Sequence, residues 1–215
     1  MAAGKEYLTI GSVGKGEYTE KKSRFLGLAL HVESEEEAAG YLEKIRKQYY
    51  DARHNCYAWI IGEQKEKIRS SDDGEPSGTA GQPILKVLEG SGCTNVMIIV
   101  TRYFGGTLLG TGGLVRAYTK ASREALEDAE LVRMCLCERF TVTIDYSFLD
   151  RVMYYLRQAG IAPDDTLYSD RVGIVLTVRA DLAQGVRERI TTLTGGGALF
   201  EEVGRDFYPV SVPEE

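Results

Sequence analysis

Histidine and cysteine are scarce in this chain of 215 residues, which has two histidines, His31 and His54. A catalytic metal centre built on several histidines is therefore excluded. None of the cysteines forms a Cys-x-x-Cys pair, so the chain lacks the ligand spacing that is usual for a structural zinc site. Free cysteine is among the most buried residue types, and we expect core thiols at all of these positions: Cys56, Cys93, Cys135 and Cys137.

Long apolar runs are also missing. The longest, Val96–Val100 and Ile174–Val178, are far shorter than the roughly 20 residues that a membrane-spanning helix needs. The N-terminal stretch MAAGKEYLTIGSVGKGEY has no apolar segment of the kind found in a secretory signal. We therefore expect a cytoplasmic protein that does not bind membranes.

Positive charge is limited, and lysine is absent from residues 133–215. The formal net charge of the chain is −6. Residues 1–132 carry 17 lysines and arginines against 19 acidic residues, and residues 133–215 carry 9 arginines against 13. A broadly basic surface for nucleic acid is excluded, although a local basic patch in the first part is compatible with these numbers.

Two domains are predicted, over residues 1–134 and 135–215. In the first, apolar runs predict strands at Arg24–Val32, Asn55–Ile61 and Asn95–Thr101. Periodic apolar positions predict a helix behind the capping residue Ser34, a short helix stopped by Gly90, and a helix over Leu114–Ala129. The segment 65–81 is polar and rich in turn residues, and 11–16 (GSVGKG) is predicted to be a loop.

The second domain follows the order β-α-β-β-α-β. Strands are predicted over Arg139–Tyr146, Ile161–Ser169, Val172–Ala180 and Ala198–Tyr208. Ser147 and Asp181 are the expected caps of the two helices. This order is that of the ferredoxin-like split-βαβ fold.

The stretch Val100–Tyr118, VTRYFGGTLLGTGGLVRAY, concentrates glycine between an apolar run and a helix. A glycine-rich turn before a helix presents backbone N–H groups and the positive end of the helix dipole to an anion. Arg102 and Arg116 would add charge-assisted hydrogen bonds. The stretch matches neither the P-loop nor the dinucleotide fingerprint, so tight packing of the loop against a sheet is an equal alternative.

The stretch Ser70–Gly81, SSDDGEPSGTAG, holds three carboxylates: Asp72, Asp73 and Glu75. Such a group could bind Mg²⁺ or Ca²⁺ or perform acid–base chemistry, but the EF-hand spacing is absent and a solvated acidic turn is the alternative. His54 is a candidate base or a hydrogen-bonded structural group. No nucleophile–base pair can be recognised, and we predict no catalytic residue, no metal site and no cofactor.

Four motifs in this order, KKSRFLGLAL, RHNCYAWIIG, SDDGEPSGTAGQPIL and VTRYFGGTLLGTGGLVRAYTKA, resemble the IMPACT family, also called the YigZ family. The match covers about residues 18–127, and the motif positions agree throughout. The C-terminal part resembles the small domain appended in bacterial members. The resemblance implies an α+β chain: an N-terminal α/β domain like domain 2 of ribosomal protein S5, then a ferredoxin-like domain like the last domain of elongation factor G.

The resemblance also implies a role in translation, because eukaryotic members are translational regulators that act by binding a ribosome-associated protein. The ribosome, RNA or a translation-associated protein is the partner it suggests here. Some bacterial members have been labelled proline dipeptidases, but two histidines and no recognisable set of metal ligands do not support a dinuclear metallopeptidase. The sequence does not set the oligomeric state.

We therefore predict a non-enzymatic binding protein. The alternative is an enzyme acting on a small phosphorylated or nucleotide substrate through the same loop and the acidic turn. An enzyme would have a deep pocket joining the two, and a binding module a shallow charged groove. The predicted binding residues are Arg53, His54, Asp72, Asp73, Glu75, Arg102, Tyr103, Phe104, Gly105, Gly106, Gly110, Gly112, Gly113, Arg116 and Lys120.

Overall fold

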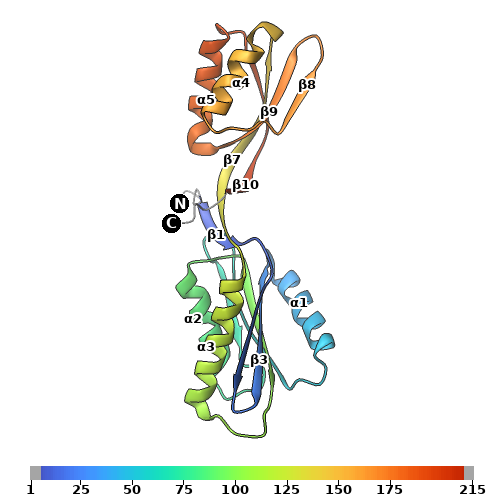
Figure 1. Ribbon diagram of the computed structural model, residues 1–215, viewed down its shortest axis with the longest axis vertical. Coiled ribbons are helices and arrows are strands. Elements are labelled where there is room, and N and C mark those ends of the chain that lie inside the picture. The colour runs from blue at the N-terminus through green and yellow to red at the C-terminus, as the bar shows by residue number, and fades with distance from the viewer. Residues whose placement is uncertain (1–5, 211–215) are drawn as a thin grey trace. The chain divides into compact units, whose positions relative to one another are not determined.

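The computed structural model describes residues 6–210, and the chain divides into two compact units (Figure 1). The first unit extends to Arg133, and the second covers Met134–Val210. Strand β7 (Leu131–Ile144) contains the division. None of the helices in this described part of the chain is long and apolar enough to cross a membrane.

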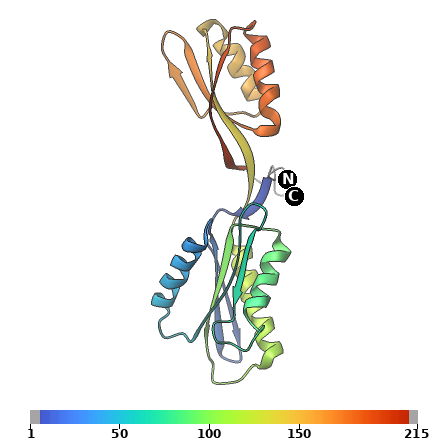
Figure 2. The ribbon, with the colours of Figure 1, turned by 180° about the vertical axis from the view of Figure 1, so that it is seen from behind.

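The first unit is a five-stranded sheet with helices on both faces. Its strands follow the order β2-β3-β6-β4-β5, and neighbouring strands are antiparallel. Helices α2 and α3 cover one face and α1 covers the other (Figures 1 and 2). The strands are β2 (Gly14–Glu20), β3 (Ser23–His31), β4 (His54–Ile61), β5 (Lys67–Ser71) and β6 (Val96–Tyr103). The helices are α1 (Glu35–Gln48), α2 (Gly81–Ser91) and α3 (Gly110–Asp128).

The central strand β6 is buried on both faces, which explains its unbroken apolar run. Ile98 and Val100 pack with α2 and α3, whereas Met97 and Ile99 pack with α1. Because successive side chains of a strand point to opposite faces, Arg102 belongs to the α2–α3 side and Tyr103 to the α1 side. This alternation decides which residues meet at the candidate site.

Helix α3 lies so close to β2 and β3 that glycine is required beneath it. A Cβ atom at Gly14 would lie 2.0 Å from the Ala125 carbonyl oxygen, and one at Gly16 would lie 2.5 Å from the Ala125 nitrogen. At Gly27 the clash would be with the Ala121 carbonyl oxygen, at 2.4 Å. The prediction of a loop over 11–16 is therefore wrong from Gly14 onward, since these glycines allow a helix to approach a strand.

Other boundaries differ from the sequence predictions. The polar segment 65–81 contains the edge strand β5, which pairs with β4. Helix α2 continues through Gly90 and ends before Gly92, whose φ of 74° is left-handed. Helix α3 begins at Gly110, four residues before the predicted start at Leu114, so three of the glycines lie in its first turn. Helix starts without a polar cap are hard to locate from sequence.

The second unit is ferredoxin-like, as predicted. Its elements follow the order β7-α4-β8-β9-α5-β10, and the strands are arranged β10-β7-β9-β8. Strand β1 (Glu6–Ile10) also pairs with β7. The other elements are α4 (Leu149–Gln158), β8 (Asp165–Tyr168), β9 (Val172–Arg179), α5 (Ala180–Leu193) and β10 (Leu199–Val210).

Both predicted caps in this unit are wrong. Ser147 lies inside a short 3-10 turn, Tyr146–Phe148, and Phe148 is the residue that precedes α4. Asp181 lies in the first turn of α5, where its charge favours the helix dipole, but Arg179 occupies the cap position. The apolar faces of the strands and helices nevertheless form one core, as the alternation predicted. The chain is thus α+β, with an S5 domain 2-like domain followed by a ferredoxin-like domain.

Candidate binding site at one end of the N-terminal domain

The start of β4 and the end of β6 lie side by side at one end of the sheet, because His54 is paired with Arg102. Arg53 and His54, where β4 begins, form a corner of the domain (the Arg53–His54 corner), which therefore meets the segment after β6. A hollow of about 470 Å³ opens between them and the start of α3. It is lined by Arg53, His54, Glu75, Pro76, Arg102, Phe104, Leu108, Leu109, Gly110, Thr111 and Leu114.

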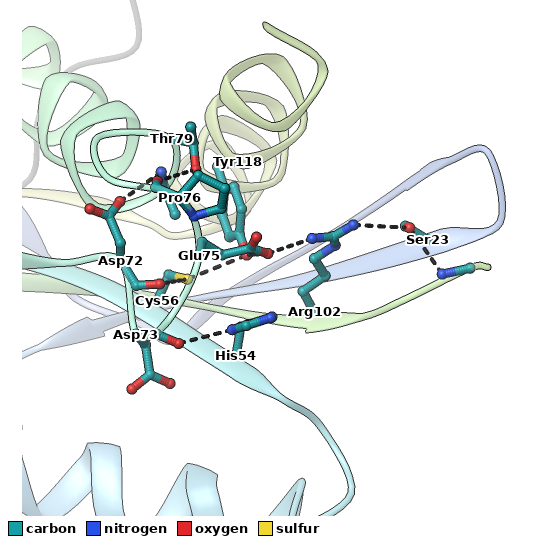
Figure 3. Close-up of polar contacts among 12 residues, drawn as sticks. Ser23, His54, Cys56, Asp72, Asp73, Glu75, Pro76, Thr79, Arg102 and Tyr118 are labelled. Atoms are coloured by element: carbon teal, nitrogen blue, oxygen red, sulfur yellow. Dashed lines mark hydrogen bonds and ion pairs between the residues drawn. The ribbon is translucent and has the colours of Figure 1, made fainter. Parts of the chain in front are cut away.

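A buried ion pair forms part of the lining (Figure 3). The Nη1 of Arg102 donates to Oε1 of Glu75 at 2.6 Å, and the two side chains are 7% and 3% exposed. The Tyr118 hydroxyl, on α3, donates to the same carboxylate oxygen at 2.8 Å. A buried charge is tolerated when it is paired and hydrogen-bonded, so each side chain depends on the others.

Arg102 also joins the β2–β3 hairpin to the segment after β6. Its Nη2 lies 3.5 Å from the Ser23 hydroxyl oxygen, which accepts a hydrogen bond from the Gly105 backbone at 3.0 Å. Its guanidinium lies over the rings of Phe25 and Phe104, at 5.4 and 5.6 Å. A Cβ atom on Gly105 would lie 2.1 Å from the Lys22 carbonyl carbon. Close packing therefore explains this glycine.

The Asp72 side chain holds the acidic turn in shape through hydrogen bonds to the backbone of the turn. Its carboxylate accepts hydrogen bonds from the backbone N–H groups of Gly78, Ala80 and Gly81, at 2.8, 2.9 and 2.8 Å. Burial acts to raise the pKa of Asp72, but these three donors outweigh burial and hold the pKa below its usual value. The Asp72 carboxylate thus accepts from N–H groups at the start of α2. Ala80, the residue before this helix, makes no side-chain capping bond of its own.

Asp73 ties the turn to both neighbouring elements. Its carboxylate accepts from Arg46 of α1 at 2.6 Å and from the Asn55 backbone at 2.7 Å. Its carbonyl oxygen lies 2.9 Å from Nδ1 of His54. Because a carbonyl oxygen only accepts, Nδ1 carries the hydrogen of this bond. His54 is thus a fixed part of the hollow's lining.

Cys56 lies next to this network without being reactive. Its thiol donates to the Asp72 carbonyl oxygen at 3.0 Å. Burial raises the pKa of the Cys56 thiol far above its ordinary value, and it does the same to the pKa of the Tyr118 hydroxyl. Both groups therefore keep their protons at neutral pH, and Cys56 lacks the thiolate that nucleophilic catalysis requires.

The acidic turn is bonded into the domain and is not a solvated loop. All three carboxylates accept hydrogen bonds from the protein, from backbone N–H groups, Arg46, Arg102 and Tyr118. Over residues 6–210, no group of three or more His, Cys, Asp and Glu residues is arranged to hold a metal ion. Through these bonds Asp72, Asp73 and Glu75 hold the turn against α1, α2, α3 and β6, and we call this arrangement the clamp. It shapes one wall of the hollow.

The structure separates the predicted site residues into two sets. Those that line the hollow are Arg53, His54, Glu75, Arg102, Phe104 and Gly110. Tyr103 points to the other face of the sheet, where its hydroxyl donates to Asp51 at 2.8 Å and its ring packs edge-on against Tyr49. The remaining predicted residues are not part of the lining: Asp72, Asp73, Gly105, Gly106, Gly112, Gly113, Arg116 and Lys120.

Two of those outer residues lie along α3. The ammonium group of Lys120 sits over the Tyr18 ring of β2, 4.4 Å from its centre. The hydrogen bond to Glu20 raises the pKa of Tyr18 above its ordinary value, and the charge of Arg116, one turn earlier on α3, opposes this rise in part. The structure places Arg102 in the lining of the hollow and Arg116 outside that lining, near Tyr18 of β2.

Sequence reasoning missed Ser23 and Tyr118 as members of this network. Tyr118 is part of the apolar stripe of α3, and its hydroxyl meets Glu75 only because α3 packs over the acidic turn. Ser23 lies 79 residues from its partner Arg102. No local pattern marks either residue.

The fold and the site define a two-domain α+β protein with a ligand-sized hollow at one end of its S5 domain 2-like domain. Residues 21–126 match the model of the Impact N-terminal domain, and residues 142–196 match a domain of unknown function, DUF1949. The chain belongs to the IMPACT family.

Relatives match along most of the chain. The IMPACT family member YvyE of Bacillus subtilis is 37% identical over 196 residues, which are 91% of this chain and 90% of the relative. The IMPACT family member YigZ of Escherichia coli is 41% identical over 140 residues, 64% of this chain and 69% of the relative. A solved structure described as that of a hypothetical protein superposes with a TM-score of 0.62 at 31% identity, covering 93% of this chain and 98% of the other.

Proposed function

We propose that this chain is a non-enzymatic binding protein that regulates translation by contacting the ribosome, its RNA or a translation-associated protein. The contact surface is the end of the N-terminal domain that contains the hollow. The observation that carries this proposal is that the carboxylates of the acidic turn are used internally. A general base or a metal ligand must be available to a substrate, and these groups are held by protein donors.

The outward-facing groups at this end are of the kind that recognise a partner. Arg53 is exposed, and Phe104 and Leu108 are 51% and 84% exposed beside the hollow. Exposed apolar side chains next to an arginine are typical of binding surfaces. Together they offer a charge contact and an apolar contact in one place.

The β2–β3 hairpin adds positive charge at the same end. Its turn residues, Lys21 and Lys22, both have positive φ, 45° and 66°, where asparagine or glycine is favoured. Two lysines here cost stability. Both are exposed, and the backbone of Lys22 lies against Gly105. We interpret this as a basic tip that guides an acidic partner to the surface.

The link to translation rests on the fold. The two domains are similar to domain 2 of ribosomal protein S5 and to the last domain of elongation factor G, which both work in the translation apparatus. A shared fold is an analogy and does not establish a function, so this part of the proposal must be tested by a binding experiment.

The test is sedimentation of a cell lysate through a sucrose gradient at low and high salt. We expect the wild-type protein to travel with ribosomal particles at low salt and to be released at high salt, because phosphate contacts weaken with ionic strength. A double variant at this end, Arg53→Glu with Lys22→Glu, should stay at the top of the gradient.

A second double variant, Lys86→Glu with Arg123→Glu, is the matched control. It makes the same change of charge at exposed positions on α2 and α3, away from the hollow. It should sediment like the wild type. The proposal fails if the wild type stays at the top at every salt concentration, and the surface is wrong if both double variants behave alike.

The hollow also meets one expectation of the alternative, an enzyme, because it joins the acidic turn to the glycine segment. A screen with phosphorylated small molecules separates the two functions. Turnover of any of them by purified protein, lost on substitution of His54, would favour the enzyme.

A further inference from the structure

We infer that the hollow binds the phosphate group of a nucleotide, with the phosphate at the start of α3 and the base against Phe104. This inference deepens the proposed function, because it names the ligand of the same site: a terminal nucleotide of RNA.

The start of α3 is open toward an anion. The helix has 19 residues, and the residue before it, Leu109, makes no side-chain capping bond. Its first turn contains no acidic residue. The first N–H groups of a helix have no partner within the helix, and they carry the positive end of its dipole. Gly110 and Thr111 bring this end to the hollow.

Arg102 supplies a second and independent observation. Its side chain is 7% exposed and lines the hollow, yet its Nε–H has no hydrogen-bond partner. Nearly all buried donors are paired in folded proteins, so an unpaired guanidinium N–H beside the hollow is unusual. The Nε atom is itself closed to solvent, and the guanidinium must shift slightly before an acceptor in the hollow can pair with it. A phosphate presents several acceptor oxygens and suits an arginine.

The charge balance of the hollow favours an anion. Glu75 is also part of the lining, but Arg102 neutralises it and Tyr118 donates to it. The charges left over are the exposed guanidinium of Arg53 and the positive end of α3. His54 contributes a ring whose Nδ1 is already bonded to Asp73.

The rest of the lining fits the other half of a nucleotide. Phe104 is half-exposed, and the Arg102 guanidinium lies 5.6 Å from its ring centre on one side. Bases stack on such rings without regard to sequence. Leu108, Leu109 and Leu114 add apolar contact. The volume of about 470 Å³ lies within the range of about 300–1,000 Å³ that is typical of small-ligand sites.

The experiment measures binding of uridine monophosphate, uridine and inorganic phosphate to the full chain by calorimetry. We expect saturable binding of the monophosphate, with uridine and inorganic phosphate each at least 10-fold weaker. Phe104→Ala should weaken the monophosphate 10-fold and leave inorganic phosphate unchanged.

The decisive variant is Thr111→Asp, paired with Thr111→Asn as a control of the same size. An aspartate in the first turn of a helix favours the helix dipole, so this variant should fold at least as well as the wild type. Its negative charge should nevertheless make binding of the monophosphate at least 10-fold weaker than in the asparagine variant, which carries no charge at the same position.

Three results would overturn the inference: no binding of the monophosphate at millimolar concentration, equal binding by the aspartate and asparagine variants, or equally tight binding of a phosphoserine peptide. The last result would assign the site to a phosphorylated protein. These outcomes are separate from those of the gradient experiment. Nucleotide binding without ribosome association would remove the proposed function alone, and association without nucleotide binding would remove this inference alone.

Discussion

The acidic turn and the glycine-rich segment are the two most chemically suggestive parts of this chain, and the structure uses them in opposite ways. The carboxylates of the turn all point to protein donors, so they hold the domain together. The glycine segment leaves helix N–H groups uncapped and exposes Phe104 and Leu108. The comparison teaches that a concentration of charge in the sequence can be used up inside the fold, whereas the uncapped helix start and the exposed apolar groups belong to the surface that we propose for binding.

The largest expected effect comes from breaking the buried ion pair. Glu75→Ala leaves the Arg102 guanidinium buried without its partner and should cost about 3–5 kcal/mol of unfolding free energy. Chemical denaturation followed by circular dichroism measures this. The double variant Glu75→Leu with Arg102→Met removes both charges and should recover much of the loss. A loss below about 1 kcal/mol in the single variant would show that the turn is not a structural clamp.

A smaller loss is expected from Asp72→Asn, about 1.5–3 kcal/mol, because the amide replaces a charged acceptor of three backbone N–H groups. Since the pKa of Asp72 is lower in the folded protein, its contribution is present above the pKa of the unfolded chain and is lost as the pH falls below about 4. The wild type should therefore lose stability on acidification more steeply than Asp72→Asn. Parallel stability curves from pH 6 to pH 2 would contradict this assignment.

Alanine substitutions separate a glycine that is required for packing from one that is not. Gly16→Ala places a methyl group 2.5 Å from the Ala125 nitrogen and should destabilise the domain by about 1–3 kcal/mol. Gly112 lies in the first turn of α3, and a methyl group there would have open space within 4 Å, so Gly112→Ala should be neutral or stabilising by up to about 1 kcal/mol. Thermal unfolding of the two variants compares them directly. Equal effects would mean that both glycines serve the same purpose.

The smallest effect on stability is expected at Arg53, which is exposed. Arg53→Ala should change the unfolding free energy by less than about 0.5 kcal/mol, and yet weaken salt-sensitive association with ribosomal particles. Sedimentation and denaturation of the same preparation measure both quantities. If Arg53→Ala instead unfolds the domain, Arg53 belongs with the clamp rather than with the binding surface.

Local patterns predicted much of the fold. The apolar run of β6, the capping residue Ser34 before α1 and the βαββαβ order of the second domain all have signals within a few residues, and the structure contains each of them. The two missed strands share one cause. Strands β2 and β5 are polar edge strands with little apolar content, and the strand character of Gly14–Gly16 depends on the helix packed above it.

The candidate site was likewise predicted in part from the sequence. The sequence brought the Arg53–His54 corner, Glu75 and the glycine segment together through motifs, and the structure places residues of all three around one hollow. Periodicity alone could have shown that Arg102 and Tyr103, as neighbours on a strand, face opposite sides. The sequence could not show which face of the sheet carries the hollow, because that depends on how α3 lies over the sheet.

The sequence by itself determined the two-domain organisation, the element order of the second domain and the family, because these follow from local periodicity and from motifs along the chain. Only the tertiary structure decided that the acidic turn is a clamp and that the start of α3 is open. Hydrogen-bond partners such as Tyr118 for Glu75, or Ser23 for Arg102, are distant in sequence and meet only when the helices pack on the sheet. Burial then removes water as a competing partner, and so it fixes which polar groups hold the fold and which remain unpaired.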